Sequence, residues 1–207
     1  MTSQNKTVYI IGPTFGFDKV VPSYGYTPYT DSSINFLTKE PDFVAWMGGV
    51  DISPDIYGED MHQNTQSPNK QRDAREIELW HKYKHLPKWG ICRGAQLLNC
   101  LNGGKLYQDV DNHAGRNHVV SDYKGRNVVV CSVHHQMMIP PSEGKILAWS
   151  HGVSTYRDRC YEGDAGPAKE PEVVFFPEDK ALCFQAHPEF GPSSCTDYFF
   201  QLVKELY

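Results

Sequence analysis

Short apolar runs that stop at glycine constrain the fold of this chain more than any other feature of its sequence. Thr7 to Gly12 reads TVYIIG, and Phe43 to Met47 reads FVAWM and runs into Gly48 and Gly49. Runs of this length and composition are typical of buried parallel strands. The paired glycines allow a tight turn or a close approach to a ligand where the second strand ends. We therefore expect a parallel sheet that gathers functional residues at its strand ends.

Segments with helical signals separate and follow these runs. Asn69 to His85 repeats apolar residues about three positions apart, and Ala95 to Leu101 stops at a glycine pair that can cap a helix. Residues 13–30 are rich in Gly, Pro and Tyr and predict a loop. Asp31 to Ser33 offer caps for a short helix over INFLTKE, and Ser193 offers one for a final helix. The first half of the chain is therefore expected to alternate strands with helices.

The second half of the chain favours β-structure. Further strands are expected over four segments: Asn127–Val133, Lys145–Trp149, Val173–Phe176 and Leu182–Ala186. Tyr156 to Pro171 predicts a surface loop or lid. We expect one domain over residues 1–207, with an α/β fold whose open, mostly parallel sheet has helices on its faces and an antiparallel extension.

Composition limits the partners of the chain. The 207 residues carry a formal net charge of −5 and the basic residues form no dense run, which argues against a nucleic-acid partner. No window approaches the ~18 apolar residues that span a bilayer, and the N-terminus has no long apolar stretch. We therefore expect a cytoplasmic protein with a small polar substrate and no membrane partner. Its six cysteines include no CxxC pair, so most are expected to stay reduced. The sequence does not determine the oligomeric state.

One cysteine has an unusual setting. Cys92 lies in WGICRGAQ between Gly90 and Gly94, with an apolar strand before it and a helical segment after it. A nucleophile on a sharp strand-to-helix turn needs small residues two positions before and after it, because neighbouring chains crowd the bend. The N-terminus of the helix also favours the thiolate form. The pattern alone fits a buried structural cysteine about equally well.

A second motif supplies a base for such a thiol. Gln185 to Glu189 reads QAHPE and comes at the end of the last apolar run. Proline disfavours helix in the residue before it, so His187 is expected to be extended and to share one side of the chain with Glu189. The carboxylate could then hold one ring nitrogen while the other exchanges a proton with the thiol. The two motifs together favour a thiol nucleophile with an imidazole base.

With these motifs, the chain resembles the class I glutamine amidotransferases and, within them, the γ-glutamyl hydrolase branch, peptidase C26. Four segments carry the resemblance: Gly48–Asp60, Gly90–Val110, Ser132–Gln136 and Gln185–Phe190. The resemblance implies a flavodoxin-like fold and a triad of Cys92, His187 and Glu189 that forms a γ-glutamyl thioester. It also implies an oxyanion hole made by the backbone N–H groups of Gly49 and Arg93. Its implied glutamyl subsite comprises Gly48, Gln96, Ser132, His134, His135 and Gln136. Cys131 departs from the family pattern, which usually has Asn at that place.

Three functions are compatible with this sequence. The first is hydrolysis of a γ-glutamyl amide, either glutamine or a γ-glutamyl amine, with water as the final acceptor. The second is a glutaminase subunit that passes ammonia to a separate synthetase, because the sequence contains no P-loop of its own. The third is a binding module that keeps the fold without turnover.

A metal site is conceivable but not expected. His113, His118, His134 and His135 could supply imidazole ligands to zinc. Their spacing fits no common zinc pattern, and a thiol mechanism needs no metal. We therefore expect neither a metal nor a cofactor.

Overall fold

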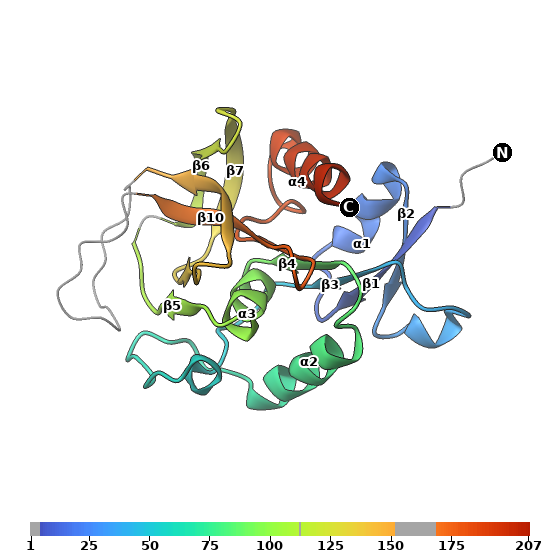
Figure 1. Ribbon diagram of the computed structural model, residues 1–207, viewed down its shortest axis with the longest axis horizontal. Helices are drawn as coiled ribbons and strands as arrows, with labels where there is room; N and C mark the ends of the chain where they lie inside the picture. Colours follow the sequence, from blue (N-terminus) through green and yellow to red (C-terminus); the bar gives the residue numbers. More distant parts are fainter. Residues whose placement is uncertain (1–4, 112, 152–168) are drawn as a thin grey trace.

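A mixed β-sheet forms the centre of the protein, as seen in a computed structural model that describes residues 5–111, 113–151 and 169–207 (Figure 1). Within these residues the strand order is β2-β1-β3-β4-β11-β10-β9-β6-β7. The strands from β2 to β11 in this order are parallel, and each later neighbour is antiparallel. The expected parallel core with an antiparallel extension is therefore confirmed. The bounds of these strands are β1 Lys6–Ile11, β2 Tyr26–Thr30, β3 Phe43–Trp46, β4 Lys88–Ile91, β6 Ala114–Asp122, β7 Asn127–Val133, β9 Lys145–Ser150, β10 Glu170–Phe176 and β11 Ala181–Phe184.

Helices cover both faces of the sheet (Figure 1). The short helix α1 (Phe17–Val20) and the last helix α4 (Ser193–Leu206) pack on one face, where Phe17 and Phe199 join one apolar core. Helices α2 (Lys70–Lys82) and α3 (Arg93–Leu101) cover the other face and share a second core. The central strands are buried from both sides, which explains why their sequences are mostly apolar, although β4 begins with the buried Lys88, which pairs with Asp179. A small antiparallel pair, β5 (Lys105–Tyr107) and β8 (Met137–Ile139), lies beside α3.

The predicted helices and strands that frame the thiol are present. Asn69 caps α2, because its side chain accepts a hydrogen bond of 2.9 Å from the backbone N–H of Arg72. Helix α3 ends at Asn102, and Gly103 follows with φ of 87°, a left-handed conformation that favours glycine. Strand β4 and helix α3 therefore meet directly at Cys92.

The prediction of a loop over residues 13–30 is wrong. This segment contains α1, the 3₁₀ helix η1 (Val21–Tyr24) and β2, which pairs in parallel with β1. Pro28 argues against a central strand, but β2 is the edge strand, where a missing N–H leaves no gap in the ladder. Tyr26 is buried, with its ring 5.2 Å from that of Trp89, so tertiary packing holds this edge in place.

The prediction of a helix after Asp31 is also wrong. Only a short 3₁₀ helix, η2 (Ile34–Phe36), forms there, and no side chain caps it. The Asp31 carboxylate instead accepts hydrogen bonds from the Tyr9 hydroxyl and from the Arg75 guanidinium, each at 2.7 Å. Because its carboxylate is engaged by these distant partners, Asp31 does not serve as the N-cap of a helix.

Three smaller differences concern the second half of the chain. Ser193 is the first residue of α4, and no side chain caps that helix, whose N-cap residue is Pro192. Strand β6 was not expected, because its polar sequence AGRNHVVSD lacks an apolar run. The loop expected over Tyr156 to Pro171 lies mostly outside the described residues, and its last two residues belong to β10.

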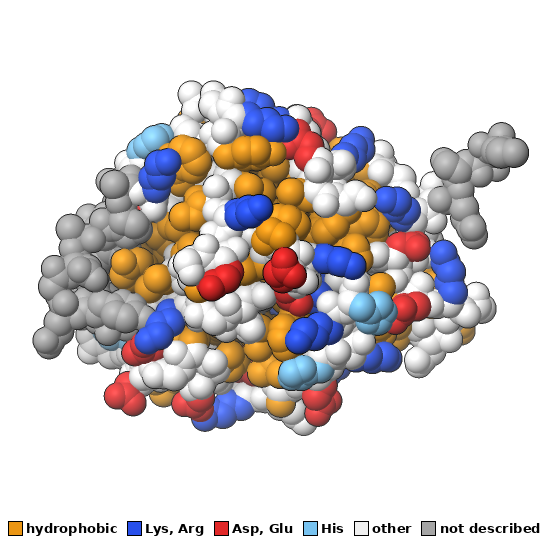
Figure 2. Space-filling model, viewed as in Figure 1, with side chains coloured by type: hydrophobic (Ala, Val, Ile, Leu, Met, Phe, Trp, Pro, Cys, Tyr) orange, Lys and Arg blue, Asp and Glu red, His pale blue; other side chains and the backbone are white. Residues whose placement is uncertain are grey.

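The described residues include no helix that is both long and apolar enough to cross a membrane. On the face shown in Figure 2, Lys and Arg side chains are interspersed with acidic and apolar ones. This face therefore presents no continuous basic patch.

Candidate active site

Cys92 occupies a strained turn between β4 and α3. Its backbone has φ of 51° and ψ of −112°, a combination that residues with a side chain rarely adopt. Hydrogen bonds hold the turn on both sides, since the Cys92 N–H donates to Phe184 O at 2.9 Å and the Gln96 N–H donates to Cys92 O at 3.1 Å. Strain of this kind is characteristic of functional sites, because the surrounding structure must maintain it.

The two glycines beside Cys92 are required by close backbone packing. A Cβ atom on Gly90 would lie 2.6 Å from the carbonyl oxygen of Gly94. One on Gly94 would overlap the carbonyl group of Trp46 in β3 and would lie 2.5 Å from its carbon. The crowding predicted from the G-x-C-x-G pattern is therefore present on both sides of the thiol.

His187 and Glu189 follow β11 and lie next to this turn. The Nδ1 atom of His187 is 2.8 Å from Oε1 of Glu189, whose side chain is fully buried. The His187 ring and the Cys92 side chain lie next to each other, since both adjoin the Cβ position of Gly48, and they interact electrostatically. Burial lowers the pKa of His187, but these interactions with Cys92 and Glu189 outweigh that effect and raise it to about 10. Cys92, His187 and Glu189 are thus brought together in one chain of contacts.

The Cys92–His187 pair lies just below the surface, beside two aromatic rings. Cys92 and His187 are only 6% and 4% exposed, so access to the sulfur is narrow. Phe190 stacks on the His187 ring at 4.8 Å, and Phe15 contacts Phe190 edge-on at 5.8 Å. Both phenylalanines are more than 40% exposed. Phe190 directly follows the QAHPE motif, but no pattern in the sequence pairs it with Phe15 beside the thiol.

The end of β3 closes another side of the pair. A Cβ atom on Gly48 would lie 2.9 Å from Cε1 of His187 and 3.6 Å from Cβ of Cys92. Arg72 donates hydrogen bonds of 3.0 Å to the carbonyl oxygens of Met47 and Gly48, and this side chain also leaves no room for a Cβ on Gly49. Arg72 therefore fixes the glycine turn, a role that its surface-helix sequence did not reveal.

Arg93, the first residue of α3, directs its side chain into the interior. The guanidinium is buried and forms ion pairs with Asp73 and Glu76 of α2. This engagement leaves the backbone N–H, at the helix N-terminus, as the group of Arg93 that could act on a ligand.

The residues predicted to form the glutamyl subsite fall into groups with different bonding partners. Gln96 lies one helical turn after Cys92 and donates to Gln136 O at 3.2 Å. His135 lies between Asp51 and Asp109, at 3.1 and 3.3 Å, and the hydrogen bond with Asp51 raises its pKa. Ser132 and His134 have other partners. The Ser132 hydroxyl donates to the carbonyl oxygen of His113, and His134 Nδ1 lies 2.8 Å from Gln136 O. Burial lowers the pKa of His134 to about 3.

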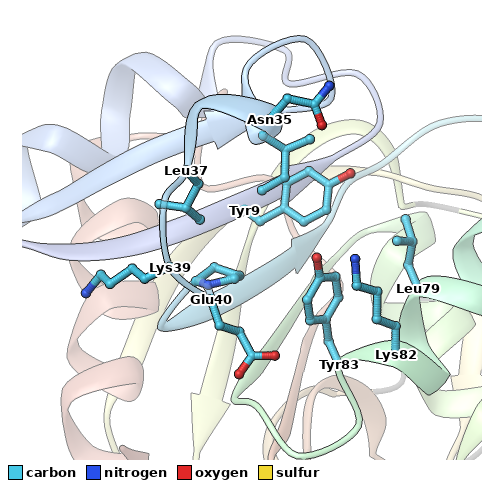
Figure 3. A pocket seen from close by; sticks show the side chains of 10 residues that line it. Tyr9, Asn35, Leu37, Lys39, Glu40, Leu79, Lys82 and Tyr83 are labelled. Atoms are coloured by element: carbon cyan, nitrogen blue, oxygen red, sulfur yellow. The ribbon is translucent and has the colours of Figure 1, made fainter.

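A cavity of about 460 Å³ lies elsewhere on the molecule, between η2 and α2 (Figure 3). The rings of Tyr9 and Tyr83 and the side chain of Lys82 line it. It contains none of the residues predicted to act in catalysis. The thiol, the imidazole and the carboxylate form the better candidate site, because they combine strain, burial and a pKa shift.

Comparison with known proteins agrees with this geometry. The sequence model of the Peptidase C26 family matches residues 21–162. A Mycobacterium tuberculosis protein that carries the name glutamine amidotransferase is 32% identical over 122 residues, 49% of this chain and 40% of the relative. The carbamoyl phosphate synthase small chain of Ralstonia nicotianae is 31% identical over 109 residues, 53% of this chain and 26% of the relative. The matches thus span less than half the length of these two curated relatives.

The fold has a counterpart among solved structures. A glutamine amidotransferase from Thermotoga maritima superposes with a TM-score of 0.59 and 16% identity, over 98% of this chain and 84% of that chain. At this identity the likeness shows the fold alone.

Proposed function

The chain belongs to the peptidase C26 family, and we propose that it is a cysteine-dependent hydrolase of γ-glutamyl amide bonds. The observation that carries the proposal is the contact chain from the strained Cys92 through His187 to the buried Glu189. A buried structural cysteine would need neither the strained turn nor an imidazole held by a carboxylate.

The proposed reaction begins with attack of the Cys92 sulfur on the carbonyl carbon of the γ-glutamyl amide. A protonated His187 next to the sulfur favours the thiolate and can give its proton to the leaving amine. The C–N bond then breaks and a γ-glutamyl thioester forms. Water, deprotonated by His187, attacks the thioester and releases glutamate and the Cys92 thiolate. Glu189 holds Nδ1 of His187, which leaves Nε2 for these proton transfers.

The oxyanion of each tetrahedral intermediate would be bound by the backbone N–H groups of Gly49 and Arg93. The support is positional, because Gly49 follows the turn that lies against Cys92 and His187, and Arg93 begins helix α3. One such donor is worth about 10²–10³ in rate. The glutamyl end would be held by Gly48, Gln96, His135 and Gln136, of which Gln96 follows Cys92 by one helical turn. Ser132 and His134 would act on the substrate only through their neighbours, because both side chains are buried and bonded within the protein.

A second candidate is an ammonia-supplying subunit. Its support is the likeness to the carbamoyl phosphate synthase small chain, a protein named as one chain of a larger synthase. The same thioester chemistry would then release ammonia for a separate synthetase.

Purified protein incubated with glutamine, and separately with γ-glutamyl-aminobutyrate, distinguishes these functions. We expect glutamate release by the isolated chain and a loss of at least about 10⁴-fold in kcat/KM for Cys92→Ala. Cys100→Ala is the matched control, since Cys100 lies in the same helix but packs in the second core.

An electrophilic glutamine analogue completes the test. A chain that releases no glutamate but is alkylated by the analogue at Cys92 would support the ammonia-supplying subunit. A chain that does neither, or a Cys92→Ala variant with full turnover, would contradict the proposed mechanism.

A further inference from the structure

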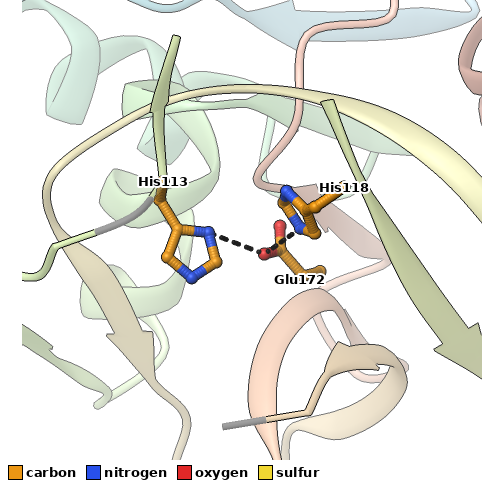
Figure 4. A group of neighbouring side chains, drawn as sticks. All are labelled: His113, His118 and Glu172. Carbon is orange, nitrogen blue, oxygen red and sulfur yellow. Dashed lines mark hydrogen bonds and ion pairs between the residues drawn. The ribbon is translucent and has the colours of Figure 1, made fainter. Parts of the chain in front are cut away.

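A second group of titratable side chains lies in the antiparallel extension of the sheet. We call His113, His118 and Glu172 the His–Glu cluster. Figure 4 shows the two imidazole rings on either side of the carboxylate. Oε1 of Glu172 is 3.2 Å from Nδ1 of His113 and 2.9 Å from Nε2 of His118. One ligand atom from each residue lies within 4.8 Å of the other two.

The fold brings these residues together from separate strands. His113 precedes β6, His118 lies within it, and Glu172 lies in β10. Strand β9 separates β6 from β10 in the sheet, but it pairs with β6 only at Ser121 and Asp122. The other end of β6 is therefore free to place its histidines over Glu172.

The surroundings of the cluster resemble the outer shell of a metal site. The second ring nitrogen of His113, Nε2, is 3.3 Å from Oε2 of Glu170. Histidines that bind metals usually have their other nitrogen on a carboxylate or carbonyl in this way, which fixes the ring orientation. The Ser150 hydroxyl donates to the same Glu170 oxygen at 2.9 Å.

A further buried histidine, His134, lies beside the cluster. His134 is 4% exposed, and its Nδ1 lies 2.8 Å from Gln136 O, which places the proton there and leaves a lone pair on Nε2. Among the described residues, Nε2 has no hydrogen-bond partner, and it lies 3.9 Å from Oε2 of Glu172, an oxygen that also has none there. Two buried acceptors facing each other are costly unless a cation lies between them.

We propose that the His–Glu cluster binds a zinc ion, with His113, His118 and Glu172 as its protein ligands. Two imidazole nitrogens and one carboxylate oxygen are donors that zinc takes in tetrahedral sites. Bond lengths of about 2.0–2.1 Å place the ligands of such a site about 3.3 Å apart, close to the separations around Glu172 Oε1. His134 would connect it to Gln136 and, through Gln136 O, to Gln96 beside the thiol.

Metal content after removal and return of zinc tests the proposal. Protein treated with a chelator and dialysed against zinc should hold one ion per chain. His118→Gln keeps a polar group opposite Glu172 but removes the nitrogen ligand, and should weaken binding by more than the about 10–100-fold that loss of an outer partner costs. His85→Gln is the matched control, because His85 pairs with Glu40 on the surface. Retention of the ion by His118→Gln, or its loss from His85→Gln alone, would overturn the proposal.

Cobalt as a spectroscopic probe covers the case in which His118→Gln does not fold. Wild-type protein loaded with cobalt should show the visible absorption of a tetrahedral ion without a sulfur-to-cobalt charge-transfer band, which separates the cluster from cysteine ligands. Absence of binding, or a charge-transfer band, would overturn the proposal. Neither measurement depends on turnover at Cys92, so failure of the zinc site and failure of the proposed hydrolase are distinguishable.

Discussion

Cys92 stands at φ of 51° because three segments of backbone meet around it. Gly90 touches the first turn of α3, Gly94 touches the end of β3, and the Cys92 N–H is bonded to the end of β11. A cysteine elsewhere in the core, such as Cys100, has an ordinary helical setting and a pKa that burial raises. The backbone around Cys92 therefore distinguishes it from the structural cysteines.

The close approach at Gly94 predicts a large effect of one methyl group. Gly94→Ala should lower the free energy of unfolding by at least about 3 kcal/mol, because the methyl group would overlap the backbone of Trp46. Gly16→Ala is the control, since Gly16 has φ of 92° but open space around its Cβ position, and should cost about 1–2 kcal/mol. Urea denaturation measures both, and equal effects would show that the contact with β3 is unimportant.

The raised pKa of His187 predicts a pH-dependent contribution to stability. The ring has a pKa of about 10 in the folded protein, against an ordinary value of 6.5. Its stabilising effect is therefore fully present below about pH 6.5 and is lost as the pH rises through about 10. The difference in unfolding free energy between wild type and His187→Gln should shrink across that interval. A difference that stays constant from pH 6.5 to 10 would contradict the assigned ion pairing.

At the scale of elements, the junction of α2 with α3 positions the candidate site. Arg93 reaches from the N-terminus of α3 to Asp73 and Glu76 of α2, and all three side chains are at most 4% exposed. Arg72, also in α2, donates hydrogen bonds to the carbonyl groups that follow the end of β3. Helix α2 thus stabilises the turn at Gly48 and Gly49 and the turn at Cys92, which carry the N–H groups of the proposed oxyanion hole.

Removing one partner of this buried network should be strongly destabilising. Arg93→Met leaves Asp73 and Glu76 buried without their partner and should cost about 3–5 kcal/mol. Arg75→Met, in the same helix, breaks an ion pair with Asp31 whose side chains are 46% and 39% exposed, and should cost at most about 1 kcal/mol. Chemical denaturation of both variants gives the comparison, and similar losses would argue against a special role for the Arg93 network.

At the scale of the whole molecule, one sheet runs through both halves of the chain. Strands β4 and β11 pair in parallel at its centre, and β10 continues the ladder into the antiparallel extension. Apolar residues of the first core come from both sides of this junction, among them Val8, Trp89, Val130 and Val173. The two halves therefore share one core.

This continuity predicts a single cooperative unfolding transition, as the expectation of one domain requires. Near-ultraviolet and far-ultraviolet circular dichroism should follow coincident curves with denaturant. Separate midpoints would instead show that the antiparallel extension unfolds as its own unit.

The sequence by itself determined the parts of the protein that depend on local pattern. Apolar runs determined the central strands, because strands covered on both faces have few polar positions. The spacing of Gly90, Cys92 and Gly94 predicted the turn, because a nucleophile on a sharp strand-to-helix bend needs small residues on both sides of it. The QAHPE motif placed Glu189 beside His187, but the chain turns there instead of staying extended, since the N–H groups of Phe190 and Gly191 both donate to His187 O.

Only the tertiary structure decided the features that depend on distant partners. Tyr26 makes β2 a strand by packing on Trp89, and Asp31 bonds Arg75 instead of capping a helix. The His–Glu cluster joins residues 54 to 59 positions apart, and no periodicity in the chain reveals such a meeting. Side chains of this kind are placed by the order of strands in the sheet, and that order is set by the packing of the whole core rather than by any one segment.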